Sequence, residues 1–189
     1  HSISQRTLSA IGSLKSKRPS IYVGAIAWPA AQVLAKFAYE RKKPLVVPTV
    51  PASLFRAQRP YVFSASLAQE AQGKALSSFL LGTLMGKRAA LMVGSEDIYG
   101  RLIGESFADS YLNRGGVLSQ SIRFGGSSAD GRDILKKVRD SSPDAIVFPS
   151  GSAAEIRSFL GRARSLGIKA PFVGGEAWDK NSLLKALIN

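Results

Sequence analysis

Hydrophobic residues in this chain fall into short runs, separated by stretches in which they recur every three or four positions. These short runs, broken only by Gly24 and Ser64, are each short enough for a buried strand and cover residues 21–26, 45–47, 61–65, 89–93, 145–148 and 172–173. The stretches with helical spacing cover residues 4–17, 29–42, 67–85, 98–113, 130–141 and 153–166. Strands that alternate with helices predict an α/β fold, in which helices cover parallel sheets.

Segment 48–60 interrupts this alternation. It contains three prolines and is predicted as an ordered loop. A shift in composition near Ser66 separates a strongly basic first part of the chain from a balanced second part. At 189 residues the chain is long enough for one large domain or two small lobes, and Ser66 is the predicted boundary.

Three predicted strands in the second part end in residues suited to binding. Tyr99, Ser150 and Glu176 each follow such a strand, and the carboxyl ends of parallel strands share one edge of a sheet. Open α/β sheets bind their ligands at that edge. We therefore expect these three side chains to form part of a small-molecule site.

The formal net charge of +13 is distributed unevenly along the chain. Residues 1–60 contain ten Lys or Arg and a single acid, Glu40, whereas residues 61–189 contain sixteen Lys or Arg and twelve Asp or Glu. A basic surface suits nucleic acid, anionic lipid or an acidic partner. A solvated basic face is the favoured interpretation, because aromatic residues do not interleave the charges as in single-strand binders. No nucleic-acid partner is expected.

The residue types present exclude several kinds of chemistry. The chain has no cysteine, and its single histidine is His1. Thiol catalysis, cysteine-based zinc sites and histidine-based triads are therefore excluded or effectively absent. The glycine-rich segments at residues 125–128 and 174–176 match neither a Walker A nor a GxGxxG phosphate loop. Neither an enzymatic activity nor a cofactor or metal ion is predicted.

Five segments of the chain, in order, resemble one protein family. They are IYVGAI, KKPLVVPT, RPYVFSAS, RAALMVGSEDIYG and ARSLGIKAPFVGGEAW, which begin at residues 21, 42, 59, 88 and 163. Together they are similar to the type I periplasmic binding proteins, and within these to the branched-chain amino acid receptors of ABC transporters.

The resemblance implies two doubly wound α/β lobes that close on a ligand about a hinge. Lobe I would comprise residues 1–66 and would be incomplete, and lobe II would comprise residues 67–189, with its end truncated. The implied partners are a small-molecule ligand and the membrane permease of an ABC transporter. The implied location is periplasmic or extracytoplasmic, with membrane attachment only through a lipid anchor outside this chain.

The resemblance also implies ligand-binding residues. Glu176 stands where family members receive a ligand ammonium group, and Tyr99 matches the tyrosine that covers the ligand. Ser150 and Ser152 fall at a further ligand-facing position. The hydroxyls that hold the ligand carboxylate in lobe I are replaced by Trp28 and Pro51. Thr49 and Ser53 lie close enough to substitute, and Trp28 would suit a flatter, aromatic or amide-like ligand.

Alternatives to these assignments remain open. Glu176 could form a salt bridge, Tyr99 could be an ordinary residue at a helix start, and Trp28 could pack under the following helix. Ser95, Glu96 and Asp97 suit helix capping better than catalysis. The departures at Trp28 and Pro51 and the basic first part also allow a second function, a sensing or protein-interaction domain of the same fold that does not serve transport.

Overall fold

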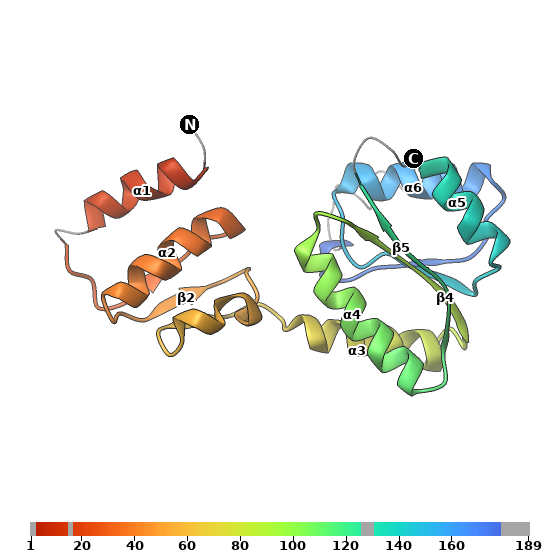
Figure 1. Cartoon of the computed structure of the whole chain (residues 1–189), viewed down its shortest axis with the longest axis horizontal. Coiled ribbons are helices and arrows are strands. Elements are labelled where there is room, and N and C mark those ends of the chain that lie inside the picture. The colour runs from red at the N-terminus through yellow and green to blue at the C-terminus, as the bar shows by residue number, and fades with distance from the viewer. Residues whose placement is uncertain (1–2, 15–16, 126–130, 179–189) are drawn as a thin grey trace. The chain divides into compact units, whose positions relative to one another are not determined.

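A computed structural model describes residues 3–14, 17–125 and 131–178 of the chain. The chain divides into two compact units, His1–Ala68 and Gln69–Asn189. This division lies two residues beyond Ser66. Both units are built from parallel strands and helices (Figure 1), as the alternating pattern predicts.

The first unit contains a small three-stranded parallel sheet. Its elements are α1 (Ile3–Leu14), β1 (Tyr22–Val23), α2 (Trp28–Glu40), β2 (Leu45–Val47), η1 (Ala52–Gln58) and β3 (Val62–Ser64). The sheet order is β1-β2-β3. The row formed by Tyr22, Leu45 and Val62 is buried in a core with Phe37 and Phe55. On the opposite face, Val23 and Phe63 are 75% and 54% exposed.

Two expectations for this unit are corrected by the structure. The strand predicted over residues 21–26 is reduced to Tyr22–Val23, because the backbone turns away at Gly24, where φ is +129°. The predicted loop 48–60 instead contains the 3-10 helix η1. Phe55, only 2% exposed, anchors this helix in the core, which the prolines at its borders do not reveal.

The second unit is a doubly wound domain around a four-stranded parallel sheet. Its elements are α3 (Gln69–Gly82), β4 (Arg88–Gly94), α4 (Ile98–Asn113), β5 (Val117–Phe124), α5 (Gly131–Asp140), β6 (Ala145–Val147), α6 (Ala153–Ser165), β7 (Phe172–Val173) and η2 (Glu176–Trp178). The order is β5-β4-β6-β7. Strand β5 is not predicted by the sequence pattern, because this edge strand alternates polar with apolar residues instead of forming an apolar run.

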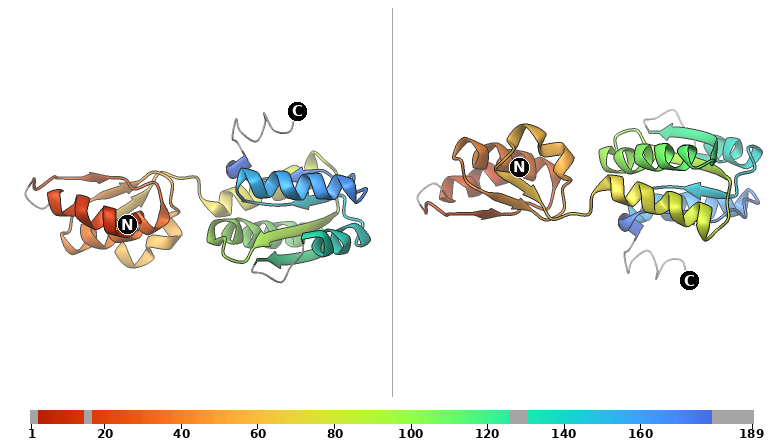
Figure 2. Two further views of the ribbon diagram at one scale, coloured as in Figure 1. Left: turned by 90° about the horizontal axis from the view of Figure 1, so that it is seen from above. Right: turned by 90° about the horizontal axis from the view of Figure 1, so that it is seen from below.

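Alternating side chains of β4 point into two separate cores. Ala90 and Met92 pack with the α5–α6 layer, whereas Leu91 and Val93 pack with the α3–α4 layer. The two layers lie on opposite faces of the sheet in Figure 1, and the right view of Figure 2 looks onto α3 and α4 side by side. This explains the nearly continuous apolar run of β4, which is typical of a strand buried on both faces.

We predict that Gly73→Ala destabilises the second unit by about 1–3 kcal/mol, the usual cost of overpacking. A Cβ at Gly73 in α3 would lie 2.5 Å from the backbone nitrogen of Phe107 and 2.7 Å from the carbonyl oxygen of Ile103, both in α4. The helices must therefore separate. Denaturant unfolding followed by circular dichroism measures the change.

Gly161→Ala is the matched control, because no atom apart from its chain neighbours and the backbone of its own helix lies within 4 Å of a Cβ added to this residue of α6. At that position alanine should raise the free energy of unfolding by about 0.5–1 kcal/mol through its better helix propensity. Equal effects of the two substitutions would contradict the close packing of α3 on α4.

Candidate functional site

The carboxyl ends of β4, β6 and β7 bring the three predicted edge residues to the same side of the second sheet. Tyr99 lies in the first turn of α4 after β4, Ser150 follows β6, and Glu176 follows β7. The strand order reverses at β4, since β5 lies on one side of it and β6 on the other. Such a switch point leaves a crevice at the carboxyl ends of the strands, where open α/β sheets bind ligands.

Tyr99, Glu176 and Gln72 form a closed set of three hydrogen bonds. The amide nitrogen Nε2 of Gln72 donates to the Tyr99 hydroxyl at 2.7 Å, and that hydroxyl donates to Oε1 of Glu176. The backbone N–H of Glu176 donates back to Oε1 of Gln72 at 3.3 Å. Two segments that follow different strands are therefore linked through one buried amide from α3.

This environment keeps the Tyr99 hydroxyl protonated. Burial, followed by the hydrogen bond to Glu176, raises the pKa of Tyr99 to about 12. Both factors oppose the tyrosinate, because it would be poorly solvated and would face a carboxylate. Tyr99 therefore acts as a hydrogen-bond donor at neutral pH, and it orients the carboxylate of Glu176.

Glu176 presents an exposed carboxylate without a basic partner among the residues that the structure describes. The preceding Gly175 allows this placement, because a Cβ there would lie 2.9 Å from the carbonyl oxygen of Pro149 and 3.0 Å from Oε1 of Gln72. The salt bridge considered for Glu176 is thus not formed in the described part of the chain. An anionic group at the sheet edge can receive a cationic ligand group.

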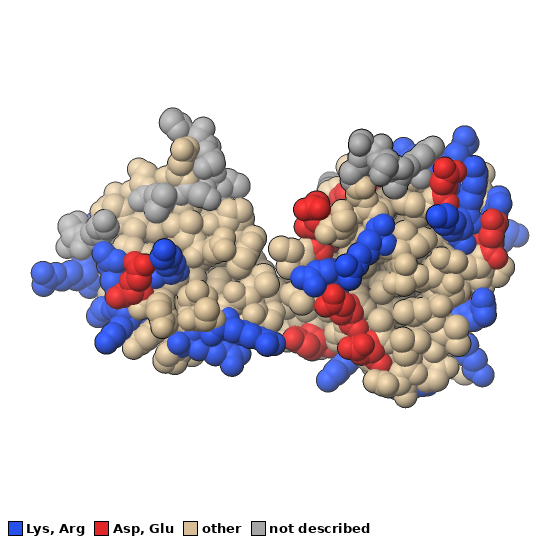
Figure 3. Space-filling model, in the orientation of Figure 1, with Lys and Arg blue, Asp and Glu red and all other residues tan. Residues whose placement is uncertain are grey.

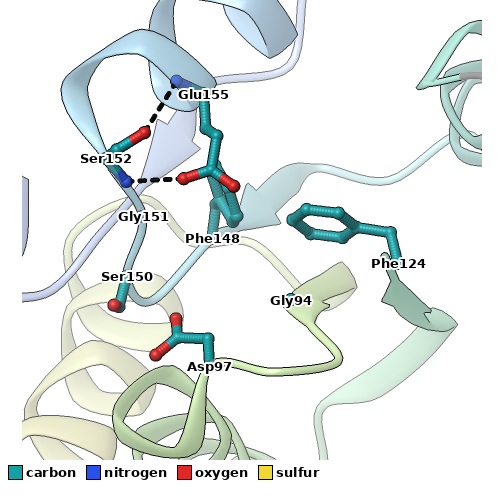
Figure 4. Close-up of a pocket in the computed structure, with 8 residues that line it drawn as sticks. All are labelled: Gly94, Asp97, Phe124, Phe148, Ser150, Gly151, Ser152 and Glu155. Carbon is teal, nitrogen blue, oxygen red and sulfur yellow. Dashed lines mark hydrogen bonds between the residues drawn. The ribbon is translucent and has the colours of Figure 1, made fainter. Parts of the chain in front are cut away.

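A hollow of about 250 Å³ lies at the carboxyl ends of β4, β5 and β6 (Figure 4). It is lined by Gly94, Asp97, Phe124, Phe148, Ser150, Gly151, Ser152 and Glu155. Figure 4 shows the Asp97 carboxylate directed toward Ser150, with the Phe124 ring on another side. The lining therefore combines one aromatic wall with carboxylate and hydroxyl groups. Ser150 and Ser152 line this hollow, whereas Tyr99 and Glu176 belong to the hydrogen-bonded cluster.

Two residues of the hollow also cap helices. Ser152 is the N-cap of α6: its hydroxyl accepts from the backbone N–H of Glu155 at 3.2 Å, and Glu155 accepts from the Ser152 N–H at 2.8 Å. This reciprocal pair is a capping box. Asp97 caps α4 by accepting from the N–H of Gly100 at 2.9 Å, the capping role that the sequence favours for this segment.

Trp28 packs against the hydrophobic core of the first unit. It begins α2, is half-buried, and its ring centroid lies 5.7 Å from that of Phe55. This contact supports the packing alternative for Trp28, and it leaves part of the ring exposed. Trp178 behaves similarly in the second unit, where its indole N–H donates to the carbonyl oxygen of Phe148 at 2.8 Å.

The hydroxyls predicted near the end of β2 have different surroundings. Thr49 is exposed and donates to the carbonyl oxygen of Ile26 at 2.6 Å, which ties the segments after β2 and β1 together. Ser53 lies in η1, and its buried hydroxyl has no hydrogen-bond partner among the described residues. Ser64, which we did not predict, ends β3 at the same sheet edge and donates to the carbonyl oxygen of Val50.

Gln72 is the site residue that the sequence does not indicate. It is 5% exposed and lies 27 residues before Tyr99 and 104 before Glu176. The only available signal is a glutamine at a position of α3 that helical spacing places on the buried side.

The glycine-rich segment 125–128 lies mostly outside the described residues. Within those residues no group of three or more metal-ligating side chains occurs, and no helix combines the length and apolar composition needed to cross a bilayer.

Comparison with known proteins defines the class. The family model of the periplasmic binding proteins matches residues 5–187, and the chain belongs to this family. The expectation of a binding protein and not an enzyme agrees with that membership. A search of curated protein sequences found no match.

Solved structures give the same fold. A leucine-binding protein from Thermotoga maritima matches with 23% identity and a TM-score of 0.80, over 95% of this chain and 51% of its own. The branched-chain amino acid transporter substrate-binding protein of Streptococcus pneumoniae, solved with isoleucine, matches with 25% identity and a TM-score of 0.80, over 98% and 52%. A solute-binding protein from R. palustris, solved with benzoate, matches with 19% identity and a TM-score of 0.76, over 97% and 50%. The chain thus spans about half the length of these structures.

We predict that Tyr99→Phe removes one tyrosine ionisation near pH 12, measured by the ultraviolet absorbance of tyrosinate. The pKa of Tyr99 is higher in the folded than in the unfolded chain. Its proton therefore stabilises the fold below about pH 10, and that stabilisation is lost as the pH rises from about 10 to 12.

Tyr111→Phe is a matched variant, because burial also raises the pKa of Tyr111 to about 12. Ionisation of Tyr99 near pH 10 would contradict the buried hydrogen bond.

We also predict that Ser152→Ala lowers the free energy of unfolding by about 1 kcal/mol, the usual cost of a lost N-cap. Ser158→Ala, at an exposed position within α6, is the control and should change stability by less than about 0.5 kcal/mol. Thermal unfolding of both variants measures the difference. Identical melting curves would show that the capping box does not stabilise α6.

Proposed function

We propose that this chain is part of a solute-binding protein of an ABC transporter, which binds a small polar ligand and catalyses no reaction. The observation that carries this proposal is the Glu176 carboxylate, which has no ion pair with a described residue and accepts a hydrogen bond from Tyr99, while Gln72 holds the Glu176 backbone at the carboxyl edge of a parallel sheet. Family membership supports the same function, since the matched structures include substrate-binding proteins of transporters. A ligand that makes more contacts with one conformation of the protein than with another would shift the population toward the conformation that it contacts better.

Two ligand classes are consistent with the described residues. An amino acid would place its ammonium group on Glu176, as a charge-assisted hydrogen bond requires. An aromatic or amide-like compound would use the Phe124 wall of the hollow, with Ser150 and Asp97 as polar partners. Both classes have precedents among the matched structures, which were solved with isoleucine, benzoate and 4-hydroxybenzoate. We favour a ligand with a cationic group, because Glu176 is exposed and prearranged.

The proposed roles of the remaining predicted residues follow from their positions. Tyr99 would cover the ligand and keep its hydroxyl as a donor, and Ser150 would contact the ligand from the hollow. Ser152 and Thr49 would contribute hydroxyls, and the exposed part of Trp28 would contribute an apolar surface, whereas the Ser53 hydroxyl is buried and would not reach a ligand. The proposed location is extracytoplasmic, with the transporter permease as partner and a lipid anchor as the route to the membrane.

We predict that Glu176→Gln weakens binding of an amino acid by about tenfold or more, because a hydrogen bond to a charged group is worth roughly 1.5–3 kcal/mol. Thermal-shift screening against leucine, isoleucine, benzoate, 4-hydroxybenzoate and simple amides identifies the ligand class. Isothermal titration calorimetry of the variant then measures the change in Kd for the compound that binds.

Glu96→Gln is the matched control. It removes the same charge from an exposed position just after β4, where Glu96 has no ion pair among the described residues. Its Kd should remain within about twofold of the unchanged protein. An amino acid that binds both variants equally well would contradict the proposed contact with Glu176, and an aromatic acid as the sole ligand would assign recognition to the hollow.

A second candidate function is a protein-interaction or sensing domain that does not serve transport. It is favoured by the first unit, where Thr49 bonds to Ile26 and Trp28 packs on Phe55, so that both side chains have partners within the protein. If no compound of the panel shifts the melting temperature, this second function is preferred.

A further inference from the structure

Basic residues that are scattered in the sequence are brought to one edge of the first unit by the parallel sheet. Strands β1, β2 and β3 run in the same direction, so the segments that precede them share an edge. Two hydrogen bonds join these segments: the Tyr22 N–H donates to the carbonyl oxygen of Pro44 at 2.9 Å, and the Leu45 N–H donates to that of Tyr61 at 2.8 Å.

The charged residues at this edge come from the ends of separate elements. We call them the basic edge: Lys17, Arg18, Arg41, Lys42, Lys43 and Arg59. All six are exposed, and none forms an ion pair with a described residue. The one acid of the first unit is Glu40. Figure 3 shows Lys and Arg gathered on the first unit where α2 ends and β2 begins.

The second unit distributes its charges differently. There, acids accompany the basic side chains, and some of them pair on α4 and α5, as in Arg101–Glu105 at 3.2 Å and Lys136–Asp133 at 3.0 Å. The first unit has ten Lys or Arg and one acid, whereas the second has sixteen Lys or Arg and twelve acids, so the excess of positive charge is concentrated in the first unit. Six cations on one edge, with Glu40 as the one acid beside them, repel one another, and an anionic partner would relieve that repulsion.

Apolar and aromatic side chains lie among these cations. Ile21, just before β1, is 51% exposed, and Tyr39 in the last turn of α2 is 43% exposed. The Tyr39 ring packs edge-on against Tyr61 with centroids 6.0 Å apart, which fixes both rings at this edge. Arg41 lies over the Phe37 ring at 3.8 Å from its centroid. Long cationic side chains interleaved with tyrosine and isoleucine are the composition of proteins that rest on membrane interfaces.

We propose that the basic edge binds the surface of an anionic phospholipid bilayer. The edge is contributed by the ends of several elements, and its six basic side chains are exposed, which suits an extended array of headgroups better than a single small anion. It lies at the amino ends of the strands, whereas Trp28 and Thr49 lie beyond their carboxyl ends. Contact with lipid at this edge therefore leaves the opposite end of the first unit free.

The test is cosedimentation of the full chain with phosphatidylcholine vesicles that contain or lack phosphatidylglycerol. We expect binding only to the anionic vesicles, and loss of that binding in high salt, because salt screens the attraction. Lys42→Glu/Lys43→Glu should lower the partition coefficient by about tenfold or more, since each basic residue near an anionic surface contributes substantially to binding. Millimolar inorganic phosphate should not release the protein.

Lys137→Glu/Lys169→Glu in the second unit is the control, because it reverses two exposed lysines and changes the net charge equally. Its partition should stay within about twofold of the unchanged protein. Equal losses in both double variants would overturn the proposal, since they would reflect net charge alone. Absence of binding to anionic vesicles, or release by phosphate, would also overturn it. Circular dichroism confirms that each variant is folded.

Discussion

Strand β4 is the element on which the second unit depends, because it is hydrogen-bonded on both sides and buried on both faces. Its pairing with β5 and β6 fixes the switch point of the sheet, and its alternating side chains divide the two cores between α3–α4 and α5–α6. A strand with no solvent-exposed face can accept few polar residues until its end. The chemistry of the unit is therefore concentrated after Gly94, where Asp97 and Tyr99 emerge at the start of α4.

The same constraint links packing to binding. Gln72 reaches the sheet edge because α3 packs closely on α4, where Gly73 leaves no room for a side chain. The buried amide then holds the Tyr99 hydroxyl and the backbone of Glu176 together. A carboxylate arranged in this way loses little conformational freedom when a cationic group binds. The conformational entropy of its side chain has already been lost on folding, so binding loses less. The hollow adds an aromatic wall and hydroxyl groups at the same edge.

The two units use the ends of their parallel strands differently. In the second unit the carboxyl ends carry the candidate binding residues, and the numbers of basic and acidic residues, sixteen and twelve, are nearly balanced. In the first unit the carboxyl ends carry side chains that bond within the protein, such as Thr49 and Ser64, and the amino ends carry unpaired cations. Both surfaces follow from parallel pairing, since a parallel sheet brings all strand starts to one edge and all strand ends to the other.

Local pattern was sufficient for most elements and for the edge that carries Tyr99, Ser150 and Glu176, because buried parallel strands leave uninterrupted apolar runs and helices leave a three-to-four residue spacing. It failed for η1, which is held by the burial of Phe55, and for β5, which has one neighbour and an alternating composition. Only the tertiary structure placed Gln72 between Tyr99 and Glu176 and gathered the basic edge. Each of these depends on contacts between residues that lie in different elements, and hydrophobic periodicity carries no information about which elements become neighbours.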